Sequence, residues 1–242
     1  MNARATALIG VMGITVAVGT TACEQSPTVS PSSVSQNATV TGLVLLHDAG
    51  GVKPYANVQI DAYVQAGTGG SGTGVTGRFT PTNSGPDGRY SFTVPTGASV
   101  RLYIRSLDAY QPCVIAITAA GNTNLDIHAI ADPAKLGAHL PSELLVNTPT
   151  LSGTVFETTA LGRQPVPGVG VSLDMFAGLG DVSAHTLTDS DGRYVLCGLG
   201  STAATAPSVS PYVFASKSGY RLADVGTVQL NGDTIRDIEI QR

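Results

Sequence analysis

The side chains that carry most enzyme chemistry are sparse in this chain and show no arrangement typical of a catalytic site. A zinc hydrolase needs histidine ligands at short spacing and a carboxylate base, but no H-x-x-E or H-E-x-x-H pattern occurs. The four histidines stand apart from one another: His47, His128, His139 and His185. No G-x-S-x-G or S-x-x-K element supplies an activated serine. We therefore expect scattered surface histidines, no metal site, no cofactor and no enzyme activity.

Two further segments resemble ligand-binding loops only in part. Gly67–Gly72 fits the pattern G-x-G-x-x-G, but a dinucleotide site requires a strand before this pattern and a helix after it. The β-like residues Arg78–Thr80 follow instead, so we interpret Gly67–Gly72 as a loop between strands. Asp189–Gly192 resembles the start of a calcium loop, but no glutamate follows at the required distance. We interpret Asp189–Gly192 as a hairpin turn.

Two of the three cysteines, Cys113 and Cys197, lie in the body of the chain. They could form a disulfide in an oxidising compartment. Such a bond requires Cα atoms about 4.4–6.8 Å apart, and it would join two different halves of the chain. If Tyr194 and Leu196 point inward, Cys197 lies on an outward face. The sequence is compatible with a disulfide and with two free thiols.

Residues 1–22 have the features of an export signal. Ala5–Val18 is an apolar run interrupted only by two threonines, and it is short for a membrane-spanning helix. The small residues Gly19–Ala22 then precede Cys23. This arrangement resembles the lipobox of bacterial lipoproteins, in which such a cysteine is acylated and becomes the first mature residue; Thr20 stands where that family prefers leucine. The resemblance implies lipid attachment at Cys23, and an ordinary secretory signal is the alternative.

A carbohydrate platform would need exposed aromatic side chains, because the apolar faces of sugars stack on rings. The chain has no Trp, and most of its tyrosines recur in both halves, which indicates structural packing. Tyr55 alone has no aromatic counterpart. Tyr55 is therefore the one candidate for contact with a ligand, and glycan binding is an alternative function that rests on it.

Composition narrows the classes of fold and partner. Charged residues make up 12% of the chain, aromatic residues 5% and hydrophobic residues 42%, with 29 Gly and 14 Pro. This combination argues against a helical bundle and favours short strands that bury a core between turns. The net charge is −4 and no cluster of Lys and Arg occurs. We therefore expect no nucleic-acid partner.

The chain contains an internal repeat. The tetrapeptide Asp-Gly-Arg-Tyr occurs at Asp87–Tyr90 and at Asp191–Tyr194. Four further landmarks recur in the same order: Val40–Val44 with Leu151–Val155, Pro54–Asp61 with Pro167–Asp174, Tyr103 and Tyr110 with Tyr212 and Tyr220, and Asp126-Ile127 with Asp237-Ile238. The offset varies between 104 (Asp87 to Asp191) and 113 (Pro54 to Pro167). Matches in a fixed order predict two copies of one domain.

Each copy alternates apolar and polar residues with a period of two, which predicts half-buried strands. The residues expected to share a face are Val58, Ile60 and Ala62, then Tyr90, Phe92 and Val94, and in the second copy Val171, Leu173 and Met175, then Tyr194 and Leu196. The Asp-Gly pairs are strong hairpin signals. About seven such runs per copy predict two tandem Greek-key β-sandwiches of immunoglobulin or transthyretin type.

The order of these landmarks resembles that of carboxypeptidase regulatory-like domains, which are transthyretin-like sandwiches related to carbohydrate-binding-like folds. The resemblance covers most of residues 38–132 and 148–242 and is better in the second copy, at Thr188–Tyr194. It implies a fold and no peptidase activity. In that family such modules are commonly accessory, surface or adhesive parts.

The expected organisation is a signal peptide (1–22), a flexible tether (23–37), a first sandwich (38–132), a linker (133–147) able to pack against one domain, and a second sandwich (148–242). We expect an all-β, non-catalytic protein of the bacterial cell envelope, held on a membrane by a lipid. Its function would be structural, adhesive or protein-binding, with open sheet edges offered to an envelope protein. A carbohydrate-binding accessory lipoprotein with a glycan partner is the alternative.

Overall fold

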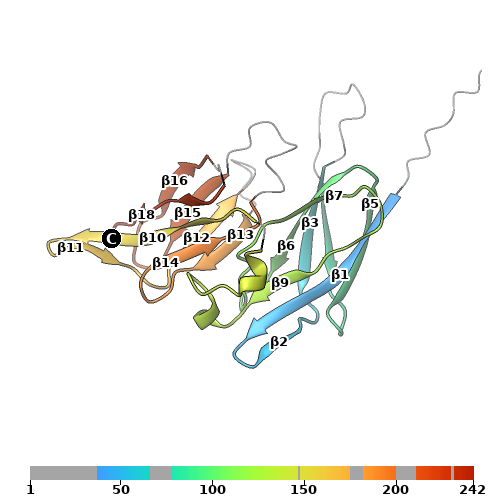
Figure 1. The fold of residues 1–242 in the computed structure, drawn as a ribbon, viewed down its shortest axis with the longest axis horizontal. Helices are drawn as coiled ribbons and strands as arrows, with labels where there is room; N and C mark the ends of the chain where they lie inside the picture. Colours follow the sequence, from blue (N-terminus) through green and yellow to red (C-terminus); the bar gives the residue numbers. More distant parts are fainter. Residues whose placement is uncertain (1–36, 66–77, 147, 175–181, 200–210, 230–231) are drawn as a thin grey trace, which may run out of the picture. The chain divides into compact units, whose positions relative to one another are not determined.

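The structure is a computed structural model of the 242-residue chain (Figure 1). It describes residues 37–65, 78–146, 148–174, 182–199, 211–229 and 232–242. All of these belong to one compact unit, Ser35–Arg242. Among the described residues, no helix has the length and apolar character needed to cross a membrane.

The first copy, sandwich 1, is built from two sheets that cover residues 37–130. Its described strands are β1 (Asn37–Asp48), β2 (Gly51–Pro54), β3 (Gln59–Gln65), β4 (Arg78–Asn83), β5 (Arg89–Pro95), β6 (Ser99–Arg105), β7 (Ile115–Thr118), β8 (Thr123–Asn124) and β9 (Ile127–Ile130). In one sheet β1 pairs antiparallel with β2 and β5 and parallel with β8 and β9. The other sheet has the order β4-β3-β6-β7.

The second copy, sandwich 2, repeats this topology strand by strand. Its described strands are β10 (Leu151–Thr159), β11 (Gly162–Pro165), β12 (Gly170–Asp174), β13 (Val182–Leu187), β14 (Arg193–Leu196), β15 (Tyr212–Ser216), β16 (Ala223–Thr227), β17 (Thr234–Ile235) and β18 (Ile238–Glu239). β10 pairs with β11, β14, β17 and β18, and the second sheet has the order β13-β12-β15-β16. The predicted fold class of two tandem β-sandwiches is confirmed. Each copy has nine described strands where about seven were expected, because its last strand is broken into two short pieces and its first strand is followed by a short hairpin strand, β2 or β11.

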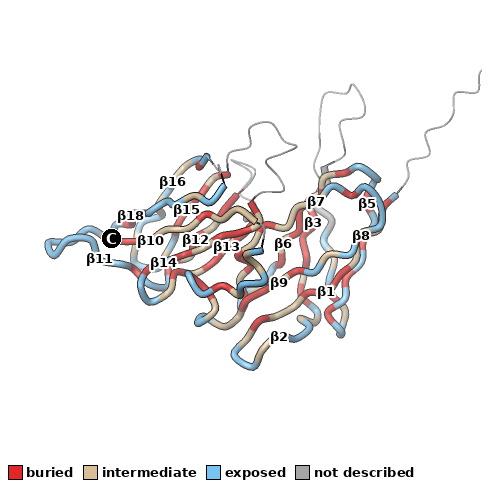
Figure 2. Tube along the Cα trace, viewed as in Figure 1, coloured by how far each residue is buried: buried red, intermediate tan, exposed pale blue. Residues whose placement is uncertain are grey.

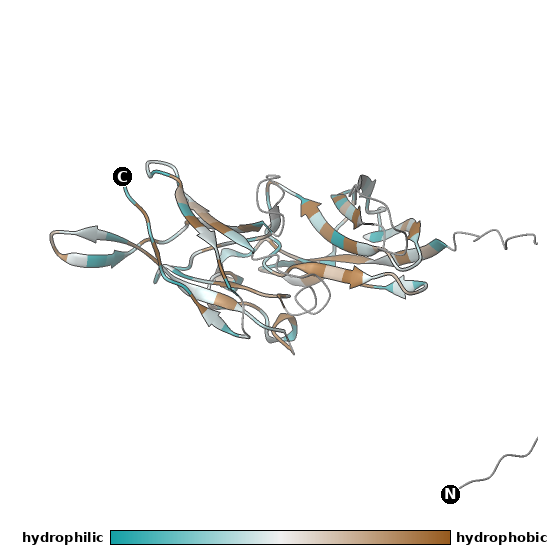
Figure 3. Ribbon diagram, turned by 90° about the horizontal axis from the view of Figure 1, so that it is seen from above, coloured by the Kyte–Doolittle hydropathy of each residue, from teal (hydrophilic) through white to brown (hydrophobic). Residues whose placement is uncertain are grey.

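Alternating burial along the strands places one core inside each sandwich (Figure 2). In β5 the inward residues Tyr90, Phe92 and Val94 are buried, and the residues between them are exposed. The predicted inward residues Val58, Ile60 and Ala62 are buried as well, as are Val171, Leu173, Tyr194 and Leu196. Hydrophobic and hydrophilic residues alternate along the strands in the same way (Figure 3). Met175 lies outside the described residues.

The structure corrects the predicted alignment of the two copies by two residues. Tyr55 and Val166 each donate their backbone N–H to a valine carbonyl in the first strand of their own copy, at 2.7 and 2.9 Å. The counterpart of Tyr55 is therefore Val166, and Pro54 corresponds to Pro165 instead of Pro167. Because side chains alternate with a period of two, a slip of two residues leaves the inward pattern unchanged. The sequence pattern alone cannot detect such a slip.

The Asp-Gly-Arg-Tyr motif ties each hairpin to the end of its own sheet. The buried Tyr90 donates its hydroxyl to Leu125 O at 2.5 Å, and Tyr194 donates to Arg236 O at 2.6 Å. A Cβ placed on Gly42 would lie 1.9 Å from that same Leu125 oxygen. These repeated residues are thus explained by the folding of each sandwich.

Candidate functional site at the joint between the sandwiches

A short segment of sandwich 1 reaches the sheet edges of sandwich 2. We call residues 111–114, which directly precede β7, the plug. The carbonyl of Gln111 accepts a hydrogen bond from the N–H of His185 in β13, at 2.8 Å. Cys197, directly after β14, donates its N–H to Pro112 O at 3.0 Å and accepts from Val114 N at 2.9 Å. The plug therefore pairs with one strand from each sheet of sandwich 2.

Two side chains of the plug fix its position. Val114 is 5% exposed and belongs to the hydrophobic core of sandwich 2, although it lies in sandwich 1 by sequence. Gln111 is fully buried, and its Oε1 accepts from Ile104 N at 2.9 Å. Its Nε2 donates to Leu102 O at 2.9 Å and to Cys113 O at 3.1 Å. The Gln111 amide thus holds the plug against β6 while Val114 enters the neighbouring core.

A disulfide joins the plug to sandwich 2. The structure bonds Cys113 to Cys197 across a parallel bridge, and their Cα atoms lie 4.2 Å apart, just below the usual range of about 4.4–6.8 Å. Cys197 does point away from the core of sandwich 2, yet it is completely buried. The structure therefore contains the bonded form of the two that the sequence left open, and the bond crosses between the two copies.

The linker forms a third apolar cluster, which we call the joint core. The linker itself contains two short 3-10 helices, η1 (Pro133–Lys135) and η2 (Ser142–Leu144). The buried members of the joint core are Ile130, Leu136, Leu140 and Cys197, and the half-buried ones are Tyr110, Cys113, Leu144, Leu145, Leu187 and Val195. The linker, which was expected to be able to pack against one domain, packs against both, because residues of both sandwiches contribute to this cluster.

The turn at Asp189–Gly192 is a docking point for the linker. Asp189 Oδ1 accepts the backbone N–H groups of Asp191 and Arg193, each at 2.9 Å. Its Oδ2 accepts from Ala138 N in the linker at 3.2 Å. A Cβ on Gly137, where φ is +66°, would lie 2.7 Å from Asp189 Cβ. The carboxylate that suggested a calcium ligand in fact binds backbone N–H groups on both sides of the joint.

The expectation of scattered surface histidines holds for His139, whose side chain is 62% exposed, and is wrong for the other three. His47 in β1 is 2% exposed, and its Nε2 lies 2.8 Å from Nδ1 of the half-buried His128 in β9. His185 in β13 packs against the rings of Tyr103 and Tyr110, and its Nδ1 lies 3.0 Å from the Tyr103 hydroxyl. Partners that are 81 and 82 residues apart in sequence bring these rings together, so no local motif signals them.

Burial dominates the electrostatics of the joint. It lowers the pKa of His185 to about 4 and lowers the pKa of both His47 and His128. Burial also lowers the pKa of Arg101 in β6, while the charge of Asp174 in β12 acts in the opposite direction. Arg101 is 9% exposed and Asp174 is 4% exposed. The positive charge of Arg101 in sandwich 1 and the negative charge of Asp174 in sandwich 2 thus interact where both side chains are largely shielded from water.

The remaining predicted site residues are distributed as follows. Tyr55 is half-buried and packs against the core of sandwich 1, and its hydroxyl lies 2.8 Å from Ser106 Oγ. Cys23 and Gly67–Gly72 lie outside the described residues. In the described part of the chain, no group of three or more His, Cys, Asp or Glu residues is placed to hold a metal ion.

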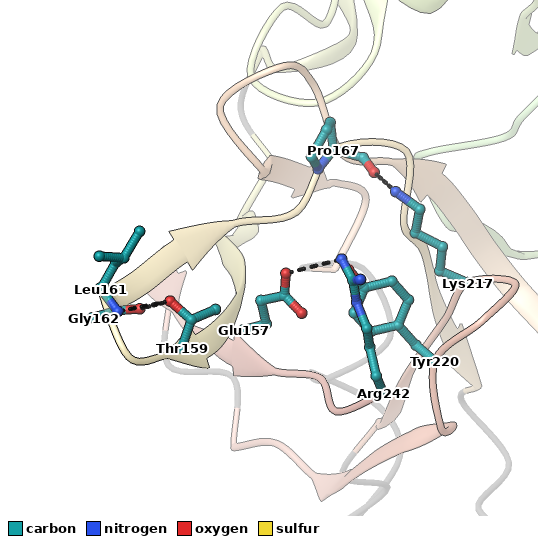
Figure 4. A network of polar contacts seen from close by, with 8 residues as sticks. All are labelled: Glu157, Thr159, Leu161, Gly162, Pro167, Lys217, Tyr220 and Arg242. Atoms are coloured by element: carbon teal, nitrogen blue, oxygen red, sulfur yellow. Dashed lines mark hydrogen bonds and ion pairs between the residues drawn. The ribbon is translucent and has the colours of Figure 1, made fainter.

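A second polar network lies within sandwich 2 (Figure 4). The Arg242 guanidinium pairs with Glu157 of β10 at 3.2 Å and donates to the Tyr220 hydroxyl at 3.0 Å. Lys217 Nζ donates to Pro167 O at 2.5 Å. These exposed contacts connect Arg242 to β10, and Lys217 after β15 to the segment between β11 and β12, and we assign them a structural role.

Sequence reasoning missed the joint, although one signal for it was present. Val195 and Cys197 are apolar residues on the outward face of β14, while Tyr194 and Leu196 fill the inward face. A strand that is apolar on both faces is covered on both faces. The corresponding outward residues of β5, Ser91 and Thr93, are polar and exposed, so this contrast could have located the joint.

Comparisons with known proteins do not identify a family. No family model matches the chain, and no curated protein matches it. The shaft pilin SpaA from Lactobacillus rhamnosus GG is 12% identical, with a TM-score of 0.29 over 85% of this chain and 97% of that chain. A minor pilin of Streptococcus agalactiae is 12% identical, with a TM-score of 0.28 over 85% of this chain and 96% of that chain. Similarities of this degree support no conclusion about function.

Proposed function

We propose that this chain is an exported, non-catalytic protein of the bacterial cell envelope, anchored by a lipid on Cys23, whose two sandwiches act as one stiff structural or adhesive module. The observation that carries this proposal is the joint, where the plug, the disulfide and the joint core connect the sandwiches. Two separate binding domains on a flexible linker would need none of these contacts. A module that presents its two sandwiches to a partner at a fixed distance and angle from each other does need them.

Two further observations support the proposed location. Disulfides persist mainly in exported proteins, and the Cys113–Cys197 bond agrees with the signal-like residues 1–22. The small residues before Cys23 support acylation there. Several acyl chains would hold the protein on a membrane durably, because each buried CH₂ contributes about 0.8 kcal/mol. The resemblance to carboxypeptidase regulatory-like domains supports an accessory role.

Membrane fractionation tests the anchor. The full chain, expressed in a bacterial host that processes lipoproteins, should sediment with membranes and resist extraction by high salt. Cys23→Ser should move to the soluble exported fraction. Cys113→Ser serves as the matched control, because it removes a cysteine without removing the lipid, and it should stay with the membranes. A Cys23→Ser variant that still sediments with membranes would contradict the anchor.

Limited trypsin digestion tests the stiff joint. Lys135 lies in η1, and its side chain is 32% exposed. We expect no cleavage after Lys135 in the folded protein, because a docked linker cannot enter a protease site. Leu136→Asp combined with Leu140→Asp places charges in the joint core and should allow the cut, which yields two fragments on a reducing gel. Equally fast cleavage of the unsubstituted protein would show that the linker is undocked.

A further inference from the structure

The titratable groups that the proposed function does not use are concentrated at the joint. His47 and His128 lie under the point where the linker leaves sandwich 1. The backbone oxygen of His47 accepts from Ala131 N at 2.8 Å and from Asp132 N at 3.3 Å. His185 lies in β13, and its backbone N–H donates a hydrogen bond to the carbonyl of Gln111 in the plug. His47 thus holds the end of sandwich 1 from which the linker leaves, His128 contacts His47 through its ring, and His185 holds the plug.

The His47–His128 pair can accept one added proton, but not two, without losing the hydrogen bond between its rings. The 2.8 Å contact between His47 Nε2 and His128 Nδ1 requires one of these nitrogens to carry a proton and the other to be free. One added proton can enter the pair at an outer ring nitrogen, and the contact survives. A second added proton must go to the accepting nitrogen. It leaves two donors facing each other and two like charges side by side, so the contact breaks.

The charges around the pair do not remove this conflict. Burial is the largest cause that lowers the pKa of both rings. Lys135 from η1 lowers the pKa of His47 further, whereas Glu143 from η2 raises it. Asp126, just before β9, and Glu143 raise the pKa of His128. Both short helices of the linker therefore present a charge to the pair, and protonation changes the interaction of the pair with each of them.

His185 adds a second acid-sensitive contact on the other side of the joint. Its ring lies between sandwich 2 and two tyrosines of sandwich 1, with ring centroids 5.7 Å from Tyr103 and 4.9 Å from Tyr110. Burial lowers its pKa to about 4. A charge on this ring would be buried against uncharged side chains, which is costly without a counter-ion. Separation of the plug from β13 would return the ring to water.

We propose that the joint is an acid-sensitive coupling: protonation of the His47–His128 pair and of His185 undocks the linker and the plug while each sandwich stays folded and the disulfide keeps the two attached. This inference rests on the proposed function, since it describes the regulation of the same joint. Because the pKa values of the docked state lie below the ordinary histidine value of about 6.5, docking is strongest above about pH 6.5 and weakens as the pH falls toward the docked values.

Hydrogen exchange on the full chain, with its disulfide intact and in detergent micelles, tests this proposal. The reporter amides are Ala138 and His185, which donate across the joint, and the control amides are those of the buried residues Ile60 and Val171. After correction for intrinsic exchange rates, protection of the reporters should fall about tenfold or more between about pH 7.5 and 4.5. Protection of the control amides should change less than about threefold.

Variants separate protonation of these rings from other effects of acid. His128→Gln combined with His185→Gln cannot form the doubly charged pair or the buried cation, so the acid response of the Ala138 amide should disappear. His139→Gln is the matched control. The His139 side chain is 62% exposed, and its Nε2 lies 3.7 Å from Asp189 Oδ2; a positive charge on this ring would strengthen that contact, so it cannot account for a loss of protection in acid. The variant should therefore keep the acid response of the unsubstituted protein. If the double variant does not fold, the ring signals of the unsubstituted protein in NMR provide the second test. The rings of His47, His128 and His185 must titrate over the same pH range in which the joint opens.

The outcomes distinguish this inference from the proposed function. Reporter amides that are unprotected already at about pH 7.5 would contradict the stiff module itself. Reporters that are protected at both pH values would contradict only the acid-sensitive coupling. A response that persists in the double variant, or a loss of protection that includes Ile60 and Val171 equally, would also overturn it.

Discussion

Sandwich 1 and sandwich 2 share their strand pairings, but they differ in two corresponding strands: β4 and β5 in sandwich 1, and β13 and β14 in sandwich 2. In sandwich 2 the N–H of His185 in β13 binds the plug, whereas the corresponding residue of β4 is Pro81, which has no N–H. In sandwich 2 the chain turns at Gly198, where φ is +77° and a Cβ would lie 2.1 Å from Val114 O. In sandwich 1 the strand continues through Val94 to the end of β5. The edges formed by β13 and β14 of sandwich 2 therefore accept the plug, whereas the corresponding edges of sandwich 1, formed by β4 and β5, could not accept such a segment.

The outward faces next to these edges show the same contrast. In sandwich 2, Leu187, Val195 and Cys197 face the joint core. Their counterparts in sandwich 1 are Asn83, Ser91 and Thr93, which are exposed. Repeats at the end of an array need a polar outer face, and repeats that contact a neighbour need an apolar one. The two copies have therefore diverged where they meet and stayed alike where each folds by itself, so sandwich 1 serves as the cap and donor and sandwich 2 as the acceptor.

The largest expected effect comes from separating the two copies. Residues 37–132 expressed alone should fold, because their core contains no residue of sandwich 2. Residues 148–242 alone lose Val114 from their core and expose Leu187 and Val195. We expect this half to aggregate or to melt well below the other, measured by circular dichroism and size-exclusion chromatography. Equal melting temperatures for both halves would remove the distinction between donor and acceptor.

Loss of the disulfide should have the next largest effect. The bond closes a loop with a sequence separation of 84, for which the loss of loop entropy in the unfolded chain gives about 4.5 kcal/mol of stabilisation. Cys113→Ala combined with Cys197→Ala should lower the free energy of unfolding by about that amount in urea titrations, and the single transition should split into two. Reduction of the unsubstituted protein should give a similar change. A change below about 1 kcal/mol would show that the bond constrains little.

Alanine substitution at two glycines separates the cost of displacing the plug from the cost of changing the backbone conformation. Gly198 and Gly219 both have positive φ, at +77° and +84°, but only Gly198 has neighbours within 4 Å of its would-be Cβ. Gly219→Ala should cost about 1–2 kcal/mol from backbone conformation alone. Gly198→Ala should cost at least about 3 kcal/mol, because the plug must also move away. Equal losses for the two variants would mean that no plug lies against Gly198.

Exchange of outward-facing residues between β5 and β14 should have the smallest effect on the free energy of unfolding, and it tests the difference between the two outward faces directly. Val195→Ser gives sandwich 2 the residue of sandwich 1, and it should destabilise the protein by about 1 kcal/mol, because a half-buried valine loses its apolar contacts. Ser91→Val is the reciprocal change on an exposed position and should alter stability by less than about 0.5 kcal/mol. Both are measured by chemical denaturation. A loss at Ser91 as large as that at Val195 would mean that both faces are covered.

The fold could be predicted because its signals are local. Alternation in Tyr90–Val94 and the two Asp-Gly turns specify strands and hairpins within a few residues of one another. The joint could not be predicted in the same way. The bond between Cys113 and Cys197 depends on how the plug docks, and the contact between His47 and His128 depends on two strands that are far apart in sequence. Sequence periodicity reports which face of a strand is buried, but not which segment covers it.

The coupling of the two sandwiches is tested most directly by backbone NMR with weak alignment of the full chain in detergent micelles at about pH 7.5. Residual dipolar couplings give a separate alignment tensor for β3 and β5 and for β12 and β14. We expect the two tensors to be equal in magnitude and orientation in the disulfide-bonded protein, and to differ once Leu136→Asp and Leu140→Asp break the joint core. Tensors that already differ in the unsubstituted protein would show that the sandwiches move independently, and they would contradict the stiff module.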